Sequence, residues 1–319
     1  MNVQPTRGSS VSIRPMRDAD VDAADLVMRL AFGTFWGLAE PHLAFGDAQL
    51  MRTRFRANPD SGFIAERDDE IVGAVLATRW GSCASMGPLV VRPDLWDQRI
   101  AHQLLEPVHA LIDEWDASLA GLFTFAHSPK HVGLYQQFGY WPQHLNAIVT
   151  RESAPAPPRE DVSLFGALSS SERTRLLADA AALTSRVHDG LDLTSEVTAV
   201  TDLGVGDTVL LRRDGELVGL AVCYNGAGES VSSSCLVKFA ALAPGSVEAD
   251  FDALIAGVES LAGDAGVATV AAGVSTSRRR AYRALAARGY RASTLGVRMH
   301  RPDQVGYCRD DDFVLDDLR

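Results

Sequence analysis

The chain has 319 residues, 46% of them hydrophobic and 22% charged, so it is long enough for two ordinary domains and apolar enough to bury their cores. The net charge of −11 is spread evenly, with 12 basic and 17 acidic side chains in the first 150 residues and 18 and 24 in the rest. Neither half has the basic excess that binding to nucleic acid or to an anionic membrane requires. No stretch approaches the roughly 20 apolar residues of a membrane span. The N-terminal segment also lacks an apolar signal-peptide core, so we expect a cytoplasmic protein without nucleic-acid or membrane partners.

The first half of the chain alternates β-rich runs with amphipathic stretches, which is typical of an α/β protein. The expected elements, in chain order, are a strand over 11–16, helices over 17–33 and about 44–57, a hairpin turning at Arg67-Asp68-Asp69, a strand over about 84–91, a turn into a long helix, a strand over 120–127, a helix over 128–140 and a strand over 144–151. The long helix has its apolar stripe at Ile100, Leu104, Val108, Leu111 and Trp115.

The second half repeats this order. Glu70-Ile71-Val72-Gly73 matches Glu216-Leu217-Val218-Gly219 at an offset of 146, and Gly139-Tyr140 matches Gly289-Tyr290 at an offset of 150. Two matches in the same order at nearly constant offset indicate a duplicated domain. The proline-rich run between the halves reads as an extended linker. We therefore expect an N-terminal domain over 1–150, a linker over 151–161, a C-terminal domain over 162–303 and a tail over 304–319.

This order of elements resembles the fold of the GNAT (Gcn5-related) N-acetyltransferase family, which would be present twice in the chain. The resemblance is strongest at "RPDLWDQRIAHQLL", which follows a strand, and at "LYQQFGY" in the short helix. The resemblance implies two tandem domains, each with a central, mostly antiparallel sheet flanked by helices. It also implies that acetyl-CoA is the cosubstrate. Its pantetheine arm would pair with a strand, and its pyrophosphate would sit on the backbone N–H groups of the following helix N-terminus, which needs no metal. The cofactor-binding residues implied in this way are Leu89, Val90, Val91, Asp97, Gln98, Arg99, Ile100, Ala101, His102, Ser128 and His131.

The family's Gln/Arg-x-x-Gly-x-Gly/Ala pattern falls on Trp96, Arg99 and Ala101. Ala101 conforms, whereas Arg99 replaces a glycine and Trp96 replaces a polar residue. We expect Arg99 to have helical backbone angles with its side chain turned outward, where a guanidinium would attract a phosphate. The other interpretation is an ordinary helix start whose tryptophan packs on the core.

The resemblance assigns catalysis to the same half. Tyr135 matches the tyrosine that gives a proton to the departing CoA thiolate. No Asp or Glu lies between Trp80 and Pro93, so a strand carboxylate is missing, and His127 is the candidate general base, with His131 second. Trp36, Trp80 and Trp141 are candidates for an acceptor pocket, although large aromatic residues also form cores. The four cysteines, Cys83, Cys223, Cys235 and Cys308, show no Cys-x-x-Cys pairing and predict reduced thiols rather than a metal site.

The second copy departs further from the family. Glu248, Asp250 and Asp252 lie where a pyrophosphate would bind and would repel it, and Leu285 stands at the position of Tyr135. The sequence therefore predicts direct transfer of an acetyl group from acetyl-CoA to a primary amine of a small molecule or peptide, in the N-terminal domain beside a degenerate C-terminal one. The alternative is a non-catalytic module that senses acyl-CoA or binds protein partners. The sequence leaves homo-oligomerisation open.

Overall fold

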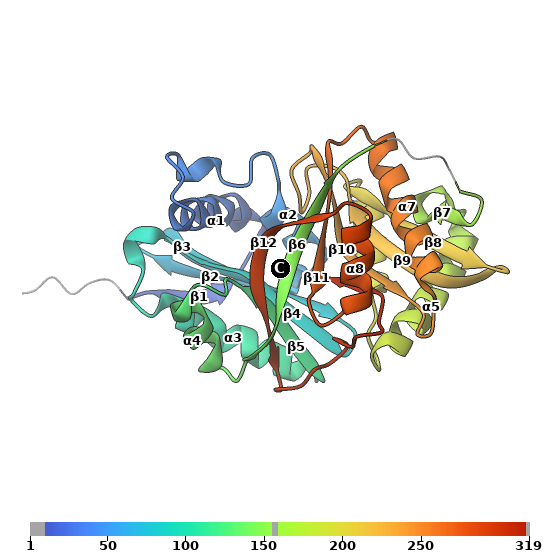
Figure 1. Ribbon diagram of the computed structural model, residues 1–319. Coiled ribbons are helices and arrows are strands. Elements are labelled where there is room, and N and C mark those ends of the chain that lie inside the picture. Colours follow the sequence, from blue (N-terminus) through green and yellow to red (C-terminus); the bar gives the residue numbers. More distant parts are fainter. Residues whose placement is uncertain (1–9, 155–158, 317–319) are drawn as a thin grey trace, which may run out of the picture.

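The computed structural model describes residues 10–154 and 159–316 and confirms an α/β fold, a mixed sheet with helices on both faces (Figure 1). Within the described residues, 13 strands belong to one sheet in the order β1-β2-β3-β4-β5-β12-β6-β11-β10-β9-β8-β7, and β13 pairs with β10 outside this path. The strands are β1 Ser12–Pro15, β2 Gly62–Arg67, β3 Glu70–Trp80, β4 Cys83–Val91, β5 Leu119–Thr124, β6 Trp141–Glu152, β7 Val162–Leu164, β8 Gly206–Arg213, β9 Glu216–Tyr224, β10 Ser234–Leu242, β11 Thr269–Ser275, β12 Arg291–Arg301 and β13 Val314–Asp316. The α-helices are α1 Val21–Phe35, α2 Leu50–Ala57, α3 Ile100–Glu114, α4 Pro129–Gln136, α5 Ser170–Val187, α6 Thr194–Asp202, α7 Glu248–Asp264 and α8 Arg279–Ala287.

In the first half, α1 and α2 cover one face of the strands, and α3 and α4 cover the other. The alternation of side chains along β3 produces this arrangement: Ala74 and Leu76 pack with α1 and α2, whereas Val75 and Ala77 pack with α3. On β4, Val90 likewise faces α1. Both faces of the sheet are therefore buried by helices, as its continuous apolar strands require.

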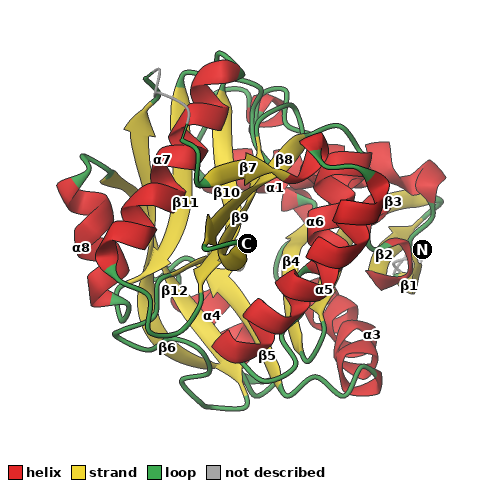
Figure 2. Cartoon of the chain, turned by 90° about the vertical axis from the view of Figure 1, so that its right-hand side faces the viewer, coloured by secondary structure: helices red, strands yellow, loops and turns green. Residues whose placement is uncertain are grey.

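The second half has the same layers. Leu210 and Leu220 pack with α5 and α6, whereas Val209 and Ala221 pack with α7 and α8, and Figure 2 shows the two helix pairs on opposite sides of the strands. Trp80 of β3 joins the core under α5 and α6, and its ring centroid lies 5.7 Å from that of Phe239. The two halves therefore share part of one core.

The two halves exchange their last strands. Strand β12 pairs with β5 of the first half, and β6 pairs with β11 of the second half, so that β6 and β12 run side by side in the middle of the sheet (Figure 1). The expected strand over 144–151 is thus present, but it extends the second half of the sheet. The limits 1–150 and 162–303 stay a proposal, with these strands exchanged between the two domains.

Some expected boundaries differ from the structure. The helix expected over 44–57 begins only at Leu50, because Phe45 and Gly46 have φ angles of 65° and 53°, which no α-helix accommodates. Strand β5 ends at Thr124 rather than at residue 127. Residues 155–158 of the expected linker and 317–319 of the expected tail lie outside the described residues.

Candidate functional site

The sheet opens between β4 and β5. The two strands pair in parallel only at Cys83–Ser85 with Leu119–Gly121, and beyond these residues they diverge. From Leu122 on, β5 lies far enough from β4 to leave one edge of β4 unpaired by it. We call this opening the splay. A cavity of about 1160 Å³ lies at the splay, and residues from both faces of the sheet and from both halves of the chain line it.

The N-terminus of α3 forms one end of the cavity. Arg99 is the N-cap residue, and its φ of 62° is left-handed, so the expectation of helical backbone angles at Arg99 was wrong. Asp97 is left-handed too, with a φ of 66°. The chain must reverse sharply here, since the indole of Trp96 donates a 2.8 Å hydrogen bond to the carbonyl of Val91 and fixes the loop to the strand end. This turn thus has the backbone form that favours glycine, although it contains none.

The side chain of Arg99 is exposed and borders the cavity without filling it. Ile100, Ala101 and His102, the first three residues of α3, also border it. The first turn of a helix has no intrahelical partners for its N–H groups. The cavity therefore ends on backbone donors at the positive end of the α3 dipole.

An ion pair spans the region between α3 and α4. The ammonium nitrogen of Lys130 lies 2.5 Å from Oδ1 of Asp97, and both side chains are exposed. Both residues border the cavity. Gln98, by contrast, points to solvent, and its side-chain oxygen accepts a hydrogen bond from Arg67 at 3.2 Å. Lys130 thus offsets the carboxylate that would otherwise repel an anion here.

Helix α4 brings His131 and Tyr135 to the cavity one turn apart. Both side chains are half-buried. Burial raises the pKa of the Tyr135 phenol above its usual value, so it stays protonated. Burial, together with the charges of Lys130 and His127, lowers the pKa of His131, so its imidazole is neutral near pH 7. The cavity therefore has a proton donor and a neutral base on one helix.

The candidate base His127 lies behind the cavity wall, next to Phe35 and Phe125. It follows the end of β5 by three residues, its side chain is exposed, and its ring stacks on Phe35 at 5.8 Å. Among the described residues, the cavity wall includes His131 but not His127.

Ser128 is the N-cap residue of α4 and borders the cavity, although its hydroxyl makes no capping hydrogen bond. Of the candidate tryptophans, Trp36 borders the cavity, whereas Trp80 is buried and donates to Glu196 at 3.1 Å. Trp141 is exposed at the start of β6, outside the cavity wall, so the structure does not place it in an acceptor pocket.

A buried charge cluster at the cavity was not predicted from the sequence. Arg54 of α2 donates two hydrogen bonds to the carboxylate of Glu229, at 2.7 and 2.6 Å, and a third to the carbonyl of Gly87 in β4. Lys238 of β10 lies 3.1 Å from the same carboxylate. Burial alone would raise the pKa of Glu229, but the charges of Arg54 and Lys238 outweigh it and lower the pKa to about 2. No local pattern could indicate this contact between residues 175 apart.

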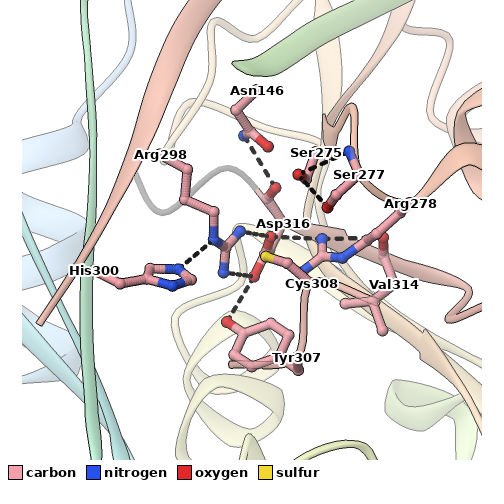
Figure 3. A network of polar contacts seen from close by, with 10 residues as sticks. All are labelled: Asn146, Ser275, Ser277, Arg278, Arg298, His300, Tyr307, Cys308, Val314 and Asp316. Atoms are coloured by element: carbon pink, nitrogen blue, oxygen red, sulfur yellow. Dashed lines mark hydrogen bonds and ion pairs between the residues drawn. The ribbon is translucent and has the colours of Figure 1, made fainter. Parts of the chain in front are cut away.

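The corresponding opening in the second half is occupied. Strand β10 pairs with β11 at Ser234–Val237 and then with β13 at Phe239–Ala241, so β13 takes the edge that β4 leaves open. Figure 3 shows the buried carboxylate of Asp316 between Arg278 and Arg298. Arg278 lies 2.9 Å from it, and the hydroxyl of Tyr307 donates to it at 2.7 Å. Burial opposes the shift, but the charges and hydrogen bonds of Arg278 and Arg298 lower the pKa of Asp316 strongly.

The other second-half positions also differ from those of the first half. Arg278 is the N-cap residue of α8, where α4 has Ser128. Leu285 is buried at the position of Tyr135.

Among the residues that the structure describes, no group of three or more His, Cys, Asp or Glu side chains is placed to hold a metal ion. No helix within residues 10–154 and 159–316 is both long and apolar enough to cross a membrane.

Residues 29–140 match the model of the family described as "Acetyltransferase (GNAT) family". A candidate acetyltransferase from Pyrococcus horikoshii has a TM-score of 0.70 at 13% identity, over 98% of this chain and 96% of that one. A GCN5-related N-acetyltransferase from Sphaerobacter thermophilus has a TM-score of 0.60 at 15% identity, over 94% and 96%. A tandem GNAT protein from the clavulanic acid biosynthesis pathway has a TM-score of 0.58 at 14% identity, over 91% and 98%. No curated protein matches the sequence.

Proposed function

We propose that the first half transfers an acetyl group from acetyl-CoA to a primary amine of a small molecule or peptide, because residues 29–140 match the model of the GNAT acetyltransferase family and the chain has the fold of a tandem GNAT protein. The observation that carries the proposal is the cavity at the splay, which joins an open strand edge, a helix N-terminus and Tyr135. The free thiols of all four cysteines agree with a cytoplasmic location.

In this proposal the pantetheine arm lies along Leu89, Val90 and Val91, and the pyrophosphate binds at the first turn of α3. The N–H groups of Ile100, Ala101 and His102 supply hydrogen bonds, and the exposed Arg99 adds a positive charge. Lys130 and Asp97 already lie beside this position as an ion pair. An arriving pyrophosphate competes with Asp97 for the Lys130 ammonium.

The acceptor then reacts in one displacement. The amine nitrogen attacks the thioester carbon, a C–N bond forms, and the C–S bond breaks after a tetrahedral intermediate. His131 takes the proton that the attacking nitrogen loses, because its imidazole is neutral and borders the cavity. Tyr135 gives its phenolic proton to the CoA sulfur as the thiolate leaves. We prefer His131 to His127 as the base, because His127 lies outside the cavity wall.

The second half does not bind acyl-CoA in this proposal, because β13 pairs with the strand edge that the pantetheine would need. Its contribution is instead Glu229 and its neighbours, which close one side of the first-half cavity. A non-catalytic acyl-CoA sensor is the second candidate. The observation that favours it is that no Asp or Glu lies between Trp80 and Pro93, so β4 has no carboxylate to act as a general base.

Calorimetric titration with acetyl-CoA tests the proposal. We expect binding on the order of micromolar, with one molecule per chain, and mass spectrometry should detect an acetylated amine when a mixture of primary amines is added. Absence of heat at millimolar acetyl-CoA contradicts acetyl transfer. Binding without release of CoA in the presence of any amine favours the sensor, and two molecules per chain contradict the occupied second site.

A further inference from the structure

The cavity passes through the sheet, so its two sides have different surroundings. On one side it borders α3 and α4, where the proposed function places acetyl-CoA. On the other side it borders α1 and α2, which pack on the opposite face. Because acetyl-CoA would fill the first side, an acceptor must reach the thioester from the second. The α1 face of the cavity is therefore the acceptor side, and this assignment rests on the proposed function.

Aromatic rings dominate this acceptor side. The last turn of α1 places Phe32, Phe35 and Trp36 at i, i+3 and i+4, the spacing that brings side chains onto one helix face. Phe45 lies in the following loop, and Phe125 comes directly after β5. All five line the cavity, and we call them the aromatic wall.

The rings of the aromatic wall touch one another. Ring centroids lie 5.1 Å apart for Phe32 and Phe45, 5.1 Å for Trp36 and Phe45, and 4.7 Å for Phe35 and Phe125. The imidazole of His131 joins the group at 5.3 Å from Phe35. The candidate base therefore borders the aromatic wall directly.

The aromatic wall is not an ordinary core. Core aromatic residues of this protein, such as Phe239 and Phe251, are fully buried. The four phenylalanines of the wall are only half-buried, and Trp36 is 45% exposed. Large apolar side chains that are partly exposed in an open cavity lose hydrophobic free energy unless a ligand covers them.

Charge on the acceptor side is scarce. Among the described residues that line the cavity, the carboxylates are those of Asp97 and Glu229. Asp97 lies at the α3 end beside Lys130, and Glu229 is bound by Arg54 and Lys238. Neither is available to a polyamine or an aminosugar, whose several charges or hydroxyl groups need such partners.

We infer that the acceptor is a primary monoamine on an aromatic body, with its ring stacked against the aromatic wall and its amino group turned towards the splay. Offset and edge-to-face ring contacts hold the body. Aromatic faces also attract the ammonium form as it enters. Once the ammonium group has lost its surrounding water, its pKa falls, which favours the neutral amine that attacks the thioester.

A panel of amines tests this inference at saturating acetyl-CoA. We expect kcat/KM for 2-phenylethylamine and tryptamine to exceed that for spermidine and glucosamine by at least about 100-fold, the discrimination that a fitted pocket can supply. A higher kcat/KM for spermidine or glucosamine overturns the substrate class while leaving acetyl transfer intact. Failure of acetyl-CoA to bind, by contrast, overturns the proposed function itself.

Trp36→Ala links the preference to the aromatic wall. We expect its KM for 2-phenylethylamine to rise about tenfold, with kcat and the KM for acetyl-CoA nearly unchanged, and Trp36→Phe to restore most of the affinity. Trp141→Ala is the matched control, because Trp141 is 47% exposed on β6 outside the cavity wall and should leave every constant unchanged. Equal effects of the two alanine variants contradict the inference.

Binding can also be followed without transfer. In the absence of acetyl-CoA, 2-phenylethylamine should change the tryptophan fluorescence of the wild type and leave that of Trp36→Phe unchanged. A signal that persists in Trp36→Phe, or no signal in the wild type at millimolar amine, places the acceptor elsewhere and overturns the inference.

Discussion

At the scale of single residues, Tyr135 and His131 divide the proton transfers by their surroundings. Both lie on one face of α4, and burial moves both pKa values in the direction of the neutral form. For the phenol this means a donor that stays protonated, and for the imidazole it means a base that is free at neutral pH. The same partly buried environment therefore keeps Tyr135 protonated as the acid and His131 neutral as the base.

Replacing Tyr135 by phenylalanine removes the phenolic proton but keeps the ring that packs on the α3 side. We expect kcat to fall by about 100-fold, within the usual range for loss of a general acid, and the Kd for acetyl-CoA to stay nearly the same. Steady-state kinetics and calorimetry measure the two effects. Tyr282→Phe on α8 is the matched control, since Tyr282 is a half-buried tyrosine of the equivalent helix. An unchanged kcat in Tyr135→Phe removes Tyr135 from the proposed role.

The pH dependence of the reaction identifies the base. A lowered pKa means that His131 loses its proton below the usual histidine range, so kcat/KM should show an acidic limb that rises with pH and lies below that range. In His131→Asn this acidic limb should disappear and the plateau should fall by at least about 100-fold. The matched variant His127→Asn should keep the limb. If His127→Asn loses the limb and His131→Asn retains it, the original choice of His127 is the right one.

At the scale of elements, the turn before α3 shows what local sequence does and does not determine. The helix start was predictable from the apolar stripe that begins at Ile100, and Ile100 and Leu104 are indeed buried. The left-handed backbone at Asp97 and Arg99 was not predictable, because side chains other than glycine rarely adopt it. The hydrogen bond from the Trp96 indole to the carbonyl of Val91, five residues earlier, closes the turn and holds it in this form.

Two substitutions at Arg99 separate backbone strain from charge. Both Arg99→Ala and Arg99→Gly remove the guanidinium and should weaken acetyl-CoA binding equally. Because alanine keeps the left-handed strain, Arg99→Gly should be the more stable variant by about 0.5–1 kcal/mol in free energy of unfolding. Chemical denaturation gives this difference. At Gln98, whose φ is not positive, the order should reverse, so the same order at both positions would contradict the strain.

The residues that line the cavity differ in how well the sequence alone could predict them. Tyr135 and the residues of the α3 turn lie within continuous motifs, and the structure brings them to one cavity. The aromatic wall joins α1, a loop and the end of β5, and it has no sequence spacing of its own. Its α1 members read equally well as a core face, and only the position of the splay distinguishes the two interpretations.

At the scale of the whole molecule, long-range contacts make the two halves interdependent. The repeat offsets revealed the duplication, but they could not reveal the exchange of β6 and β12, because each strand has the same pattern in either position. The carboxylate of Glu229 adds a second connection, since it binds Arg54 of the first half and Lys238 of the second. The first-half cavity thus depends on the second half for part of its wall.

Glu229→Gln should therefore destabilise the molecule in a pH-dependent way. The carboxylate is nearly fully buried, and its removal leaves two cations without their shared partner, which typically costs about 3–5 kcal/mol of the free energy of unfolding. Because folding lowers the pKa of Glu229 from 4.5 to about 2, its stabilisation is complete above the unfolded value and is lost as the pH falls from 4.5 towards 2. The difference between wild type and variant should shrink across the same window, as urea denaturation at several pH values can show. Asp310→Asn is the control, because its ion pair with Arg279 is exposed to solvent and should contribute little to the free energy of unfolding at any pH. A constant difference from pH 7 to pH 3 would mean that Glu229 stabilises the structure by shape alone and that its charge does not join the halves.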